Sequence, residues 1–323
     1  MGSPANNGGT NAAALNYATE YSRALSQMFP YVLNYGALYS TPNNNRYRWV
    51  NAKTIEIPSI STTGRVRADR DTVAFAQRNY ENAWETKTLS NQRKWSTLVH
   101  PMDIDQTNMV TTISNITQVF NEEQKFPEMD AYLISKIYYD WTHTKGPEQQ
   151  SNHTADTTVL DTSTILGVFD SMMLKMDNAR VPANGRILYI THEAHQLLKS
   201  AQGISRSMDI TSGPNPIDRR VNRLDQVQII GVPATLMKTL YDFTTGYAVD
   251  DDAEQINMFL VHPTAVITPV SYTFSRLDQP SAMSEGKYTY YEESFEDVFI
   301  LNKKSDAIQF NITEGGGTGT GTN

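Results

Sequence analysis

Two neighbouring histidines are the residues whose spacing comes nearest to that of a metal site. His192 and His195 stand in the run His-Glu-Ala-His. The helix of a zinc protease needs its second histidine four residues after the first, so that both imidazoles face the metal. Here the fourth residue along is Gln196, and no third ligand is evident. We therefore expect two partly exposed histidines in the first turn of a helix, with no metal.

The remaining candidates for chemistry are other histidines and two groups of aspartates. No cysteine is present, no serine stands in a G-x-S-x-G turn, and no glycine-rich phosphate loop occurs. Asp103 with Asp105, and the run 250–252, lack the spacing of a calcium loop and are typical of a helix start and an acidic turn. None of the other histidines stands beside a plausible nucleophile: His100, His143, His153 and His262. The sequence thus predicts no catalytic residue, cofactor or metal, and a protein that is not an enzyme; a hydrolase using these residues is the alternative.

Length and composition limit the class of protein. The chain has 323 residues, of which 39% are hydrophobic, enough for roughly two domains with real cores. Its net charge of −8 argues against a protein that coats nucleic acid. No apolar run approaches the roughly 20 residues that cross a bilayer, and residues 1–10 contain no apolar signal core. We expect a soluble protein with no membrane partner, intracellular when it is made.

Charge is distributed unevenly along the chain. Residues 46–100 contain ten basic and five acidic residues, a net +5. Residues 101–323 contain 16 basic and 29 acidic residues, a net −13. The basic segment is either a solvated hairpin or a surface that lies on the acidic body of a second copy.

The hydrophobic pattern indicates which elements carry these charges. The first 45 residues are typical of an extended arm with one short helix before Pro30. Residues 46–100 predict a long hairpin whose first strand has Ile55 and Ile57 on one face and whose second limb runs through Trp84 toward Trp95. So few apolar residues cannot bury such a hairpin, so it needs another subunit.

The rest of the chain mixes helices and strands. Helices are predicted over 107–141, with Pro127 opening a new helix, over 165–176, and from Thr191 to about 201. Strands are predicted over 186–190, 227–232, 258–262 and most of 288–310. Residues 142–160 and 203–220 are expected to be loops, and 315–323 a disordered Gly/Thr tail. The fold class is therefore α+β, without a regular βαβ order.

The order of these parts resembles a tailed-bacteriophage major capsid protein of the Hong Kong 97 fold. The resemblance covers nearly the whole chain after residue 45. Six blocks carry it by their order and spacing: 102–108 (MDIDQTN), 125–132 (KFPEMDAY), 181–190 (VPANGRILYI), 229–233 (IIGVP), 261–266 (VHPTAV) and 290–304 (YYEESFEDVFILNKK).

The resemblance implies a division of the chain into parts. An N-terminal arm would span 1–45 and an extended hairpin loop 46–100. The peripheral domain with its long spine helix would span 101–162, and the axial domain with its central sheet 163–265. Closing strands of both domains would span 266–312, followed by the tail over 313–323.

The resemblance also implies a function. The chain would assemble as pentamers and hexamers into the icosahedral head of a virion, made in the bacterial cytoplasm and enclosing double-stranded DNA without sequence-specific binding. A separate scaffolding protein, a portal and a decoration protein are the expected partners. An encapsulin-like shell around cargo enzymes is the alternative, and a tail-tube protein is a further competitor. The hairpin would reach over a neighbouring subunit, and the residues expected at that contact are Arg65, Arg67, Arg70, Arg78 and Trp84.

Overall fold

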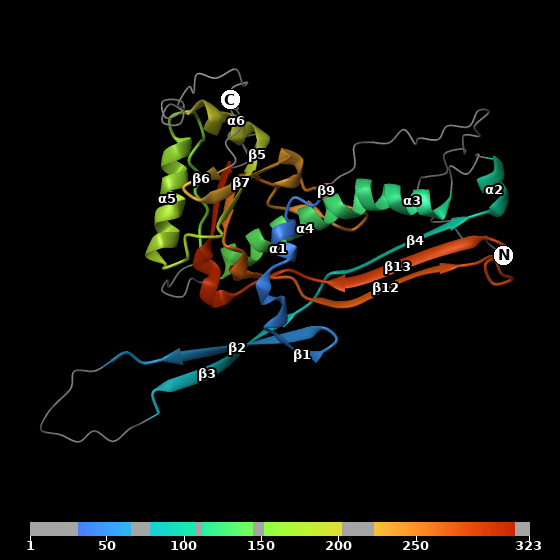
Figure 1. The fold of residues 1–323 in the computed structure, drawn as a ribbon, viewed down its shortest axis with the longest axis horizontal. Helices are drawn as coiled ribbons and strands as arrows, with labels where there is room; N and C mark the ends of the chain where they lie inside the picture. The colour runs from blue at the N-terminus through green and yellow to red at the C-terminus, as the bar shows by residue number, and fades with distance from the viewer. Residues whose placement is uncertain (1–31, 66–77, 107–111, 145–151, 202–222, 314–323) are drawn as a thin grey trace, which may run out of the picture.

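The chain folds into a lobe, a long helical arm with a sheet beside it, and a hairpin that projects away from both (Figure 1). A computed structural model describes residues 32–65, 78–106, 112–144, 152–201 and 223–313. The predicted helix before Pro30, the loop over 203–220 and the tail over 315–323 lie outside these residues. The described part is mixed helix and sheet, which confirms the predicted α+β class.

The elements have the following bounds. The helices are α1 (Gly36–Tyr39), α2 (Pro101–Gln106), α3 (Ile113–Phe120), α4 (Phe126–His143), α5 (Ile165–Asn178) and α6 (His192–Ser200). A π-helical turn, η2, spans Asn121–Lys125, and 3-10 turns are η1 (Pro42–Asn45), η3 (Ala234–Leu236), η4 (Pro263–Ala265) and η5 (Asn302–Ala307). The strands are β1 (Arg48–Asn51), β2 (Thr54–Thr62), β3 (Tyr80–Thr88), β4 (Gln92–Val99), β5 (Ile187–Thr191), β6 (Arg223–Leu224), β7 (Val227–Val232), β8 (Tyr241–Asp242), β9 (Ala248–Val249), β10 (Gln255–Val261), β11 (Val266–Ile267), β12 (Val270–Asp278), β13 (Tyr288–Glu296), β14 (Phe299–Ile300) and β15 (Ile308–Thr313).

The lobe is built on a five-stranded sheet of order β15-β10-β5-β7-β6, in which only β5 and β7 run parallel. Both faces of this sheet are buried because side chains alternate along each strand. Leu188 and Ile190 pack with α5 and α6, whereas Ile187 and Tyr189 pack with α4. The lobe is therefore three layers deep.

The two helices on one face of the sheet confirm the predicted periodicity. The helix predicted over 165–176 is α5, and the five apolar residues that recur in it at helical spacing are all buried: Ile165, Val168, Phe169, Met172 and Met176. Thr191 caps α6 by accepting a hydrogen bond from the Ala194 amide at 3.2 Å.

A new helix begins at Pro127 as predicted, since α4 starts at Phe126 with Pro127 in its first turn. This helix directly continues the preceding one, because α3, η2 and α4 form one unbroken helical segment over 113–143. Proline lacks an amide hydrogen and crowds the carbonyl four residues before it, which ordinarily breaks a helix. The π-helical turn that directly precedes α4 changes the hydrogen-bond spacing at this point, so the backbone stays right-handed at Lys125 and Phe126.

The beginning of the described chain packs on the lobe. Asp130 of α4 accepts hydrogen bonds from the backbone amides of Asn34 and Tyr35, at 2.8 and 3.4 Å. The side chains of Tyr35 and Leu38 are fully buried in the main core. Residues 34–38 thus belong to the core of their own subunit, whereas the sequence predicted that they form part of an extended arm.

The predicted second limb of the hairpin is wrong beyond Leu89. Strand β3 pairs with β2 and ends at Thr88, and β4 then joins a different sheet of order β12-β13-β4. Trp95 of β4 stacks on Phe120 of α3 with ring centroids 3.9 Å apart. The second sheet therefore lies along the spine helix (Figure 1).

Candidate intersubunit surface

The inner end of the hairpin is buried against the body. Ile55 of β2 and Leu89 pack with Ile267, Phe295 and Phe299 in a small hydrophobic cluster of their own. This cluster fixes the direction in which β2 and β3 leave the body.

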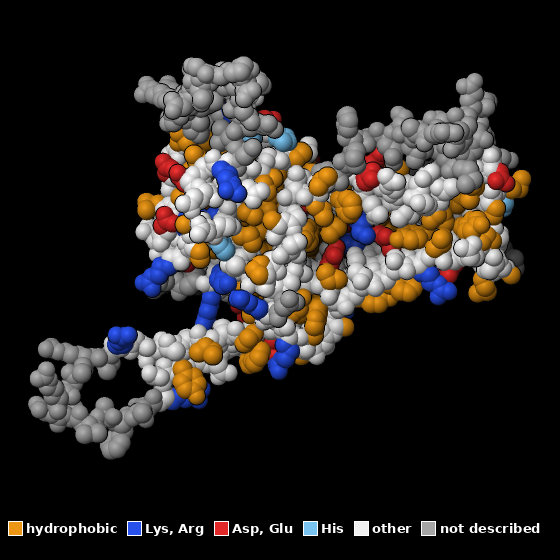
Figure 2. Space-filling view, in the orientation of Figure 1, with side chains coloured by type: hydrophobic (Ala, Val, Ile, Leu, Met, Phe, Trp, Pro, Cys, Tyr) orange, Lys and Arg blue, Asp and Glu red, His pale blue; other side chains and the backbone are white. Residues whose placement is uncertain are grey.

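The outer part of the hairpin is exposed on both faces. Ile60 is 67% exposed, Tyr80 55% and Trp84 46%. Figure 2 shows hydrophobic side chains along this projecting ribbon. Large exposed apolar side chains on a narrow ribbon are typical of a surface that another chain covers.

Cations lie over the aromatic rings of the hairpin. The guanidinium carbon of Arg48 lies 4.5 Å from the Trp84 ring centroid, and Arg48 also pairs with Glu56 at 2.7 Å. The guanidinium carbon of Arg78 lies 5.1 Å from the Tyr80 ring centroid. The ribbon thus presents flat aromatic groups with positive charge beside them, which suits an acidic and partly apolar partner surface.

The predicted contact residues fall into two groups. Arg65, Arg78 and Trp84 all lie on the hairpin and are exposed. Arg67 and Arg70 lie outside the described residues. Contact of all five with a neighbouring subunit stays a prediction.

A second exposed apolar surface was missed by the sequence reasoning. Tyr272 and Phe274 of β12 and Leu98 of β4 lie on the outer face of the β12-β13-β4 sheet, and all three are exposed. Strand β12 is also an edge strand among the described residues. The alternation of Tyr272 and Phe274 with polar neighbours was the available sequence signal.

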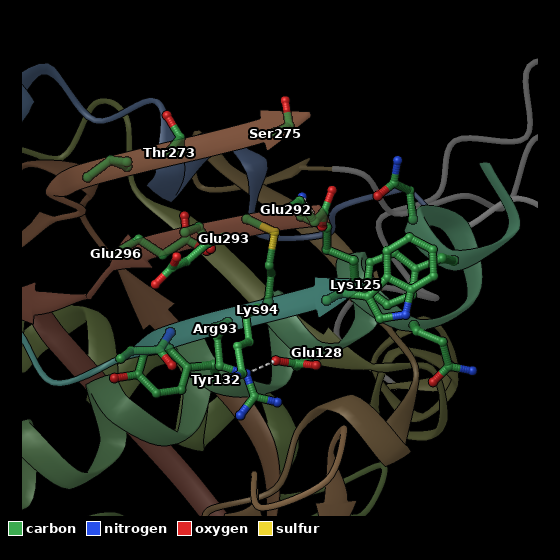
Figure 3. Close-up of a pocket in the computed structure, with 18 of the residues that line it drawn as sticks. Arg93, Lys94, Lys125, Glu128, Tyr132, Thr273, Ser275, Glu292, Glu293 and Glu296 are labelled. Atoms are coloured by element: carbon green, nitrogen blue, oxygen red, sulfur yellow. Dashed lines mark hydrogen bonds and ion pairs between the residues drawn. The ribbon is translucent and has the colours of Figure 1, made fainter. Parts of the chain in front are cut away.

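A cavity of about 770 Å³ lies between this sheet and the spine helix (Figure 3). Two ion pairs cross it, Arg93 to Glu128 at 2.6 Å and Lys125 to Glu292 at 3.0 Å. Burial raises the pKa of Glu296, an effect that Lys125 opposes and Glu128 reinforces. These charges bridge sheet and helix, so the cavity is part of the structural joint.

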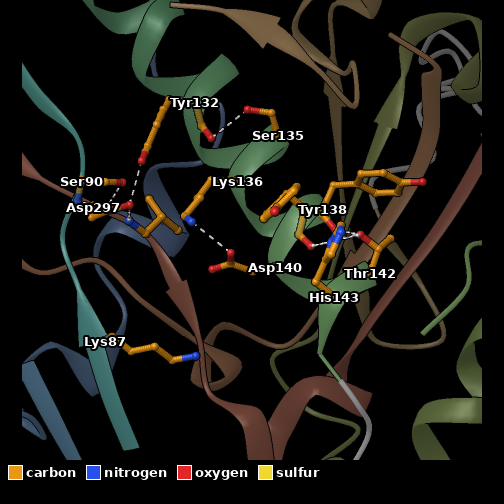
Figure 4. A network of polar contacts seen from close by, with 12 residues as sticks. Lys87, Ser90, Tyr132, Ser135, Lys136, Tyr138, Asp140, Thr142, His143 and Asp297 are labelled. Atoms are coloured by element: carbon orange, nitrogen blue, oxygen red, sulfur yellow. Dashed lines mark hydrogen bonds and ion pairs between the residues drawn. The ribbon is translucent and has the colours of Figure 1, made fainter. Parts of the chain in front are cut away.

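A buried carboxylate connects the hairpin to this joint (Figure 4). Asp297 accepts hydrogen bonds from the Ser90 amide at 2.7 Å and the Tyr132 hydroxyl at 2.8 Å. Burial, with a further contribution from Asp297, raises the pKa of the Tyr132 phenol, so it stays a donor. Ser90 directly follows the hairpin, so Asp297 ties the hairpin's inner end to α4.

Two of the candidate histidines, His153 and His262, make packing and hydrogen-bond contacts within the subunit. His153 stacks on Trp141 with centroids 5.0 Å apart and contacts the Ser305 hydroxyl at 3.0 Å. Nε2 of His262 lies 3.1 Å from the Asn184 carbonyl oxygen, and burial lowers the pKa of both histidines.

The structure shows where the other candidate catalytic and metal-binding residues lie. His192 and His195 lie in the first turn of α6 as predicted. Asp103 lies in the first turn of α2, and the Asp252 amide donates to Asp250 in a turn. Over the described ranges, no three His, Asp or Glu side chains are grouped as metal ligands would be. The described helices include none with the length and apolarity to span a bilayer.

Comparison with known proteins defines the class of this fold. No protein-family model matches the sequence, and the search of curated proteins found no match. Solved structures do match over nearly the whole chain. The capsid of cyanophage P-SCSP1u is 13% identical with a TM-score of 0.67, and 92% of each chain is covered. The mature capsid of bacteriophage PhiM1 is 12% identical with a TM-score of 0.65, covering 95% of this chain and 94% of its own.

A chain from Mycobacterium phage Che8 is also 12% identical, with a TM-score of 0.58, and the match covers 93% of this chain and 98% of that one. The chain therefore has the fold of phage capsid proteins. In particular, it has the Hong Kong 97 type of α+β fold that tailed-phage major capsid proteins share, as the sequence resemblance predicted.

Proposed function

We propose that this chain is the major capsid protein of a tailed bacteriophage. Its copies form pentamers and hexamers that close into an icosahedral head around double-stranded DNA. The observation that carries the proposal is the match to phage capsid structures over 92–95% of this chain, which leaves little of it for another role. A scaffolding protein, a portal and a decoration protein complete the proposed assembly.

The exposed hairpin supports self-assembly. Its inner end is fixed by Ile55 and Asp297, while Trp84 and Tyr80 stay exposed until a neighbour covers them. Apolar burial would supply most of the stabilisation of the shell, and the charged groups would set register and choice of neighbour. Since every subunit of a closed shell has several neighbours, each contact can be modest.

The negative charge of the body supports a shell that encloses DNA without binding it tightly. The net charge of −13 over residues 101–323 disfavours extensive phosphate neutralisation, so DNA would be enclosed with little counterion release. An encapsulin-like shell has the same fold requirement but encloses proteins instead.

Electron microscopy of the purified chain, alone and with its scaffolding protein, tests the proposal. We expect closed particles or ring-shaped capsomers, and nuclease-protected DNA in particles from infected cells. Protected cargo proteins in place of DNA would favour the encapsulin alternative. A monomer or dimer in every salt condition would refute the capsid assignment.

Charge reversal tests the hairpin contact. The triple change of Arg65, Arg67 and Arg70 to Glu is expected to block shell formation and leave the subunit folded. The matched control reverses three exposed cations of the lobe, Lys175, Arg180 and Arg223. Normal shells from the hairpin variant would exclude these arginines from the contact.

A further inference from the structure

A cavity of about 430 Å³ lies where the hairpin leaves the body, and the proposed hairpin contact does not use it. Its walls come from segments far apart in the sequence. The apolar part is formed by Ile57 and Pro58 of β2, Ile267 of β11 and Leu301. A cavity of this size and lining can hold one or two side chains from another chain.

Two cations, Arg46 and Lys304, line the same cavity, and no Asp or Glu is among the described residues that line it. Arg46 and Lys304 form no ion pair within the described residues, and Lys304 Nζ donates only to the Thr264 carbonyl, at 3.1 Å. Burial, and secondarily the nearby charge of Arg46, lowers the pKa of the Lys304 ammonium. Figure 2 shows Lys and Arg side chains gathered where the hairpin meets the body. An acidic group entering the cavity would relieve this repulsion.

An exposed acidic turn on the same chain has the matching chemistry. Asp250, Asp251 and Asp252 follow β9 in succession, and Asp251 and Asp252 are exposed. Two exposed apolar side chains lie beside these aspartates: Val249 is 46% exposed and Leu240 is 44% exposed. Leu240 is held there because its carbonyl accepts a hydrogen bond from the Asp250 amide at 3.5 Å. The turn therefore offers carboxylates for the cations and apolar side chains for the cavity walls.

We propose that the cavity lined by Arg46 and Lys304 receives the acidic turn 250–252 of a neighbouring copy. Among the described residues no ion pair joins turn and cavity within one copy, so the proposed partner is the turn of a second copy. The peptide turn is favoured over a DNA phosphate because a phosphate gains nothing from the walls formed by Ile57 and Leu301. This inference rests on the proposed self-assembly.

Charge exchange between cavity and turn tests the pairing. The cavity variant carries Arg46→Glu and Lys304→Glu, and the turn variant carries Asp251→Lys and Asp252→Lys. Each alone should lower the yield of shells about tenfold in low salt, measured by sedimentation through a sucrose gradient. A chain with all four changes should recover most of the yield, and a mixture of the two variants should recover part of it. Failure of the fourfold variant to recover would overturn the proposal.

Two controls keep the result interpretable. Asp170→Lys on the exposed face of α5 reverses a single charge and should leave the yield unchanged. Melting curves of the unassembled subunits should show all variants folded. Recovery by the fourfold variant without any recovery in the mixture would place the pairing within one copy and overturn the intermolecular contact.

A binding measurement separates this inference from the capsid proposal. A labelled peptide of residues 247–254 should bind the unassembled subunit, with affinity reduced at least tenfold by the cavity variant and weakened by salt. Binding without shells would refute the capsid proposal and keep the pairing. Shells without peptide binding, or equal displacement of the peptide by a short DNA oligonucleotide, would refute the pairing and keep the capsid proposal.

Discussion

Replacing Asp297 by alanine should destabilise the subunit far more than the loss of an exposed carboxylate. The side chain is 2% exposed and accepts four hydrogen bonds. The donors are the Ser90 amide and hydroxyl, at 2.7 and 3.2 Å, and the Tyr132 hydroxyl and Val298 amide, both at 2.8 Å. Alanine removes every acceptor and leaves these donors in the joint between hairpin, spine helix and the end of β13.

The expected loss is about 4 kcal/mol in the free energy of unfolding. A hydrogen bond to a charged group contributes roughly 1.5–3 kcal/mol, and a buried donor left without a partner costs roughly 1–3 kcal/mol. The four bonds share one carboxylate and are not additive, so the sum is well below four times either figure. At about 2.1 cal/mol/K per residue, unfolding of 323 residues has an entropy near 0.7 kcal/mol/K, so the midpoint should fall by about 6 °C.

Differential scanning calorimetry of unassembled subunits checks this value. Asp278→Ala is the matched control because Asp278 pairs with Arg276 at 2.6 Å with both side chains more than half exposed. An exposed pair of this kind contributes about 0–1 kcal/mol, so the control should shift the midpoint by no more than about 1.5 °C. Equal shifts in the two variants would refute the reasoning that Asp297 holds the joint together.

Three other substitutions have distinct expected outcomes. Trp84→Ala should leave the subunit's melting temperature nearly unchanged but sharply lower the yield of shells on a sucrose gradient, because the ring is 46% exposed within the subunit and the proposed neighbour would cover it; a large melting shift would contradict this. Glu296→Gln should raise the melting temperature at pH 8 and leave it unchanged at pH 4. Burial raises the folded-state pKa of Glu296 above its ordinary value of 4.5. The stability linked to its protonated form is therefore present below pH 4.5 and is lost as pH rises through the raised pKa. Equal effects of the substitution at both pH values would contradict this linkage. Arg186→Lys should lower the free energy of unfolding in urea by about 2–4 kcal/mol. The buried guanidinium donates to the Asp177 carboxylate and to two backbone carbonyls, and a lysine ammonium cannot make all of these bonds. A loss under about 1 kcal/mol would contradict this prediction.

Local patterns in the sequence were sufficient to predict the helices of the lobe. The apolar residues of α5 recur at helical spacing, and this spacing alone determines which face is buried. The start of α6 follows from the capping residue Thr191. These features depend on neighbours within about four residues, which a single sequence contains.

Features set by distant residues could not be predicted in the same way. The chain leaves the hairpin sheet at Ser90 because Asp297, 207 residues away, accepts its amide. No residue near Ser90 in the sequence indicates that β4 joins a different sheet, so the sequence predicts a second hairpin limb that is too long. The cavity beneath the hairpin likewise combines Arg46, Ile57 and Lys304, which no local pattern groups.

The low identity to known capsid structures explains why the surface must be tested residue by residue. At 12–13% identity over more than 90% of the chain, the fold is retained while most side chains differ. Hydrophobic patterning and volume are sufficient to specify such a fold, so the core tolerates this divergence. Contacts between subunits depend instead on particular pairs, and both partners of a pair can change together. Charge exchange between Lys304 and Asp251 therefore tests a property of this chain that fold similarity cannot supply.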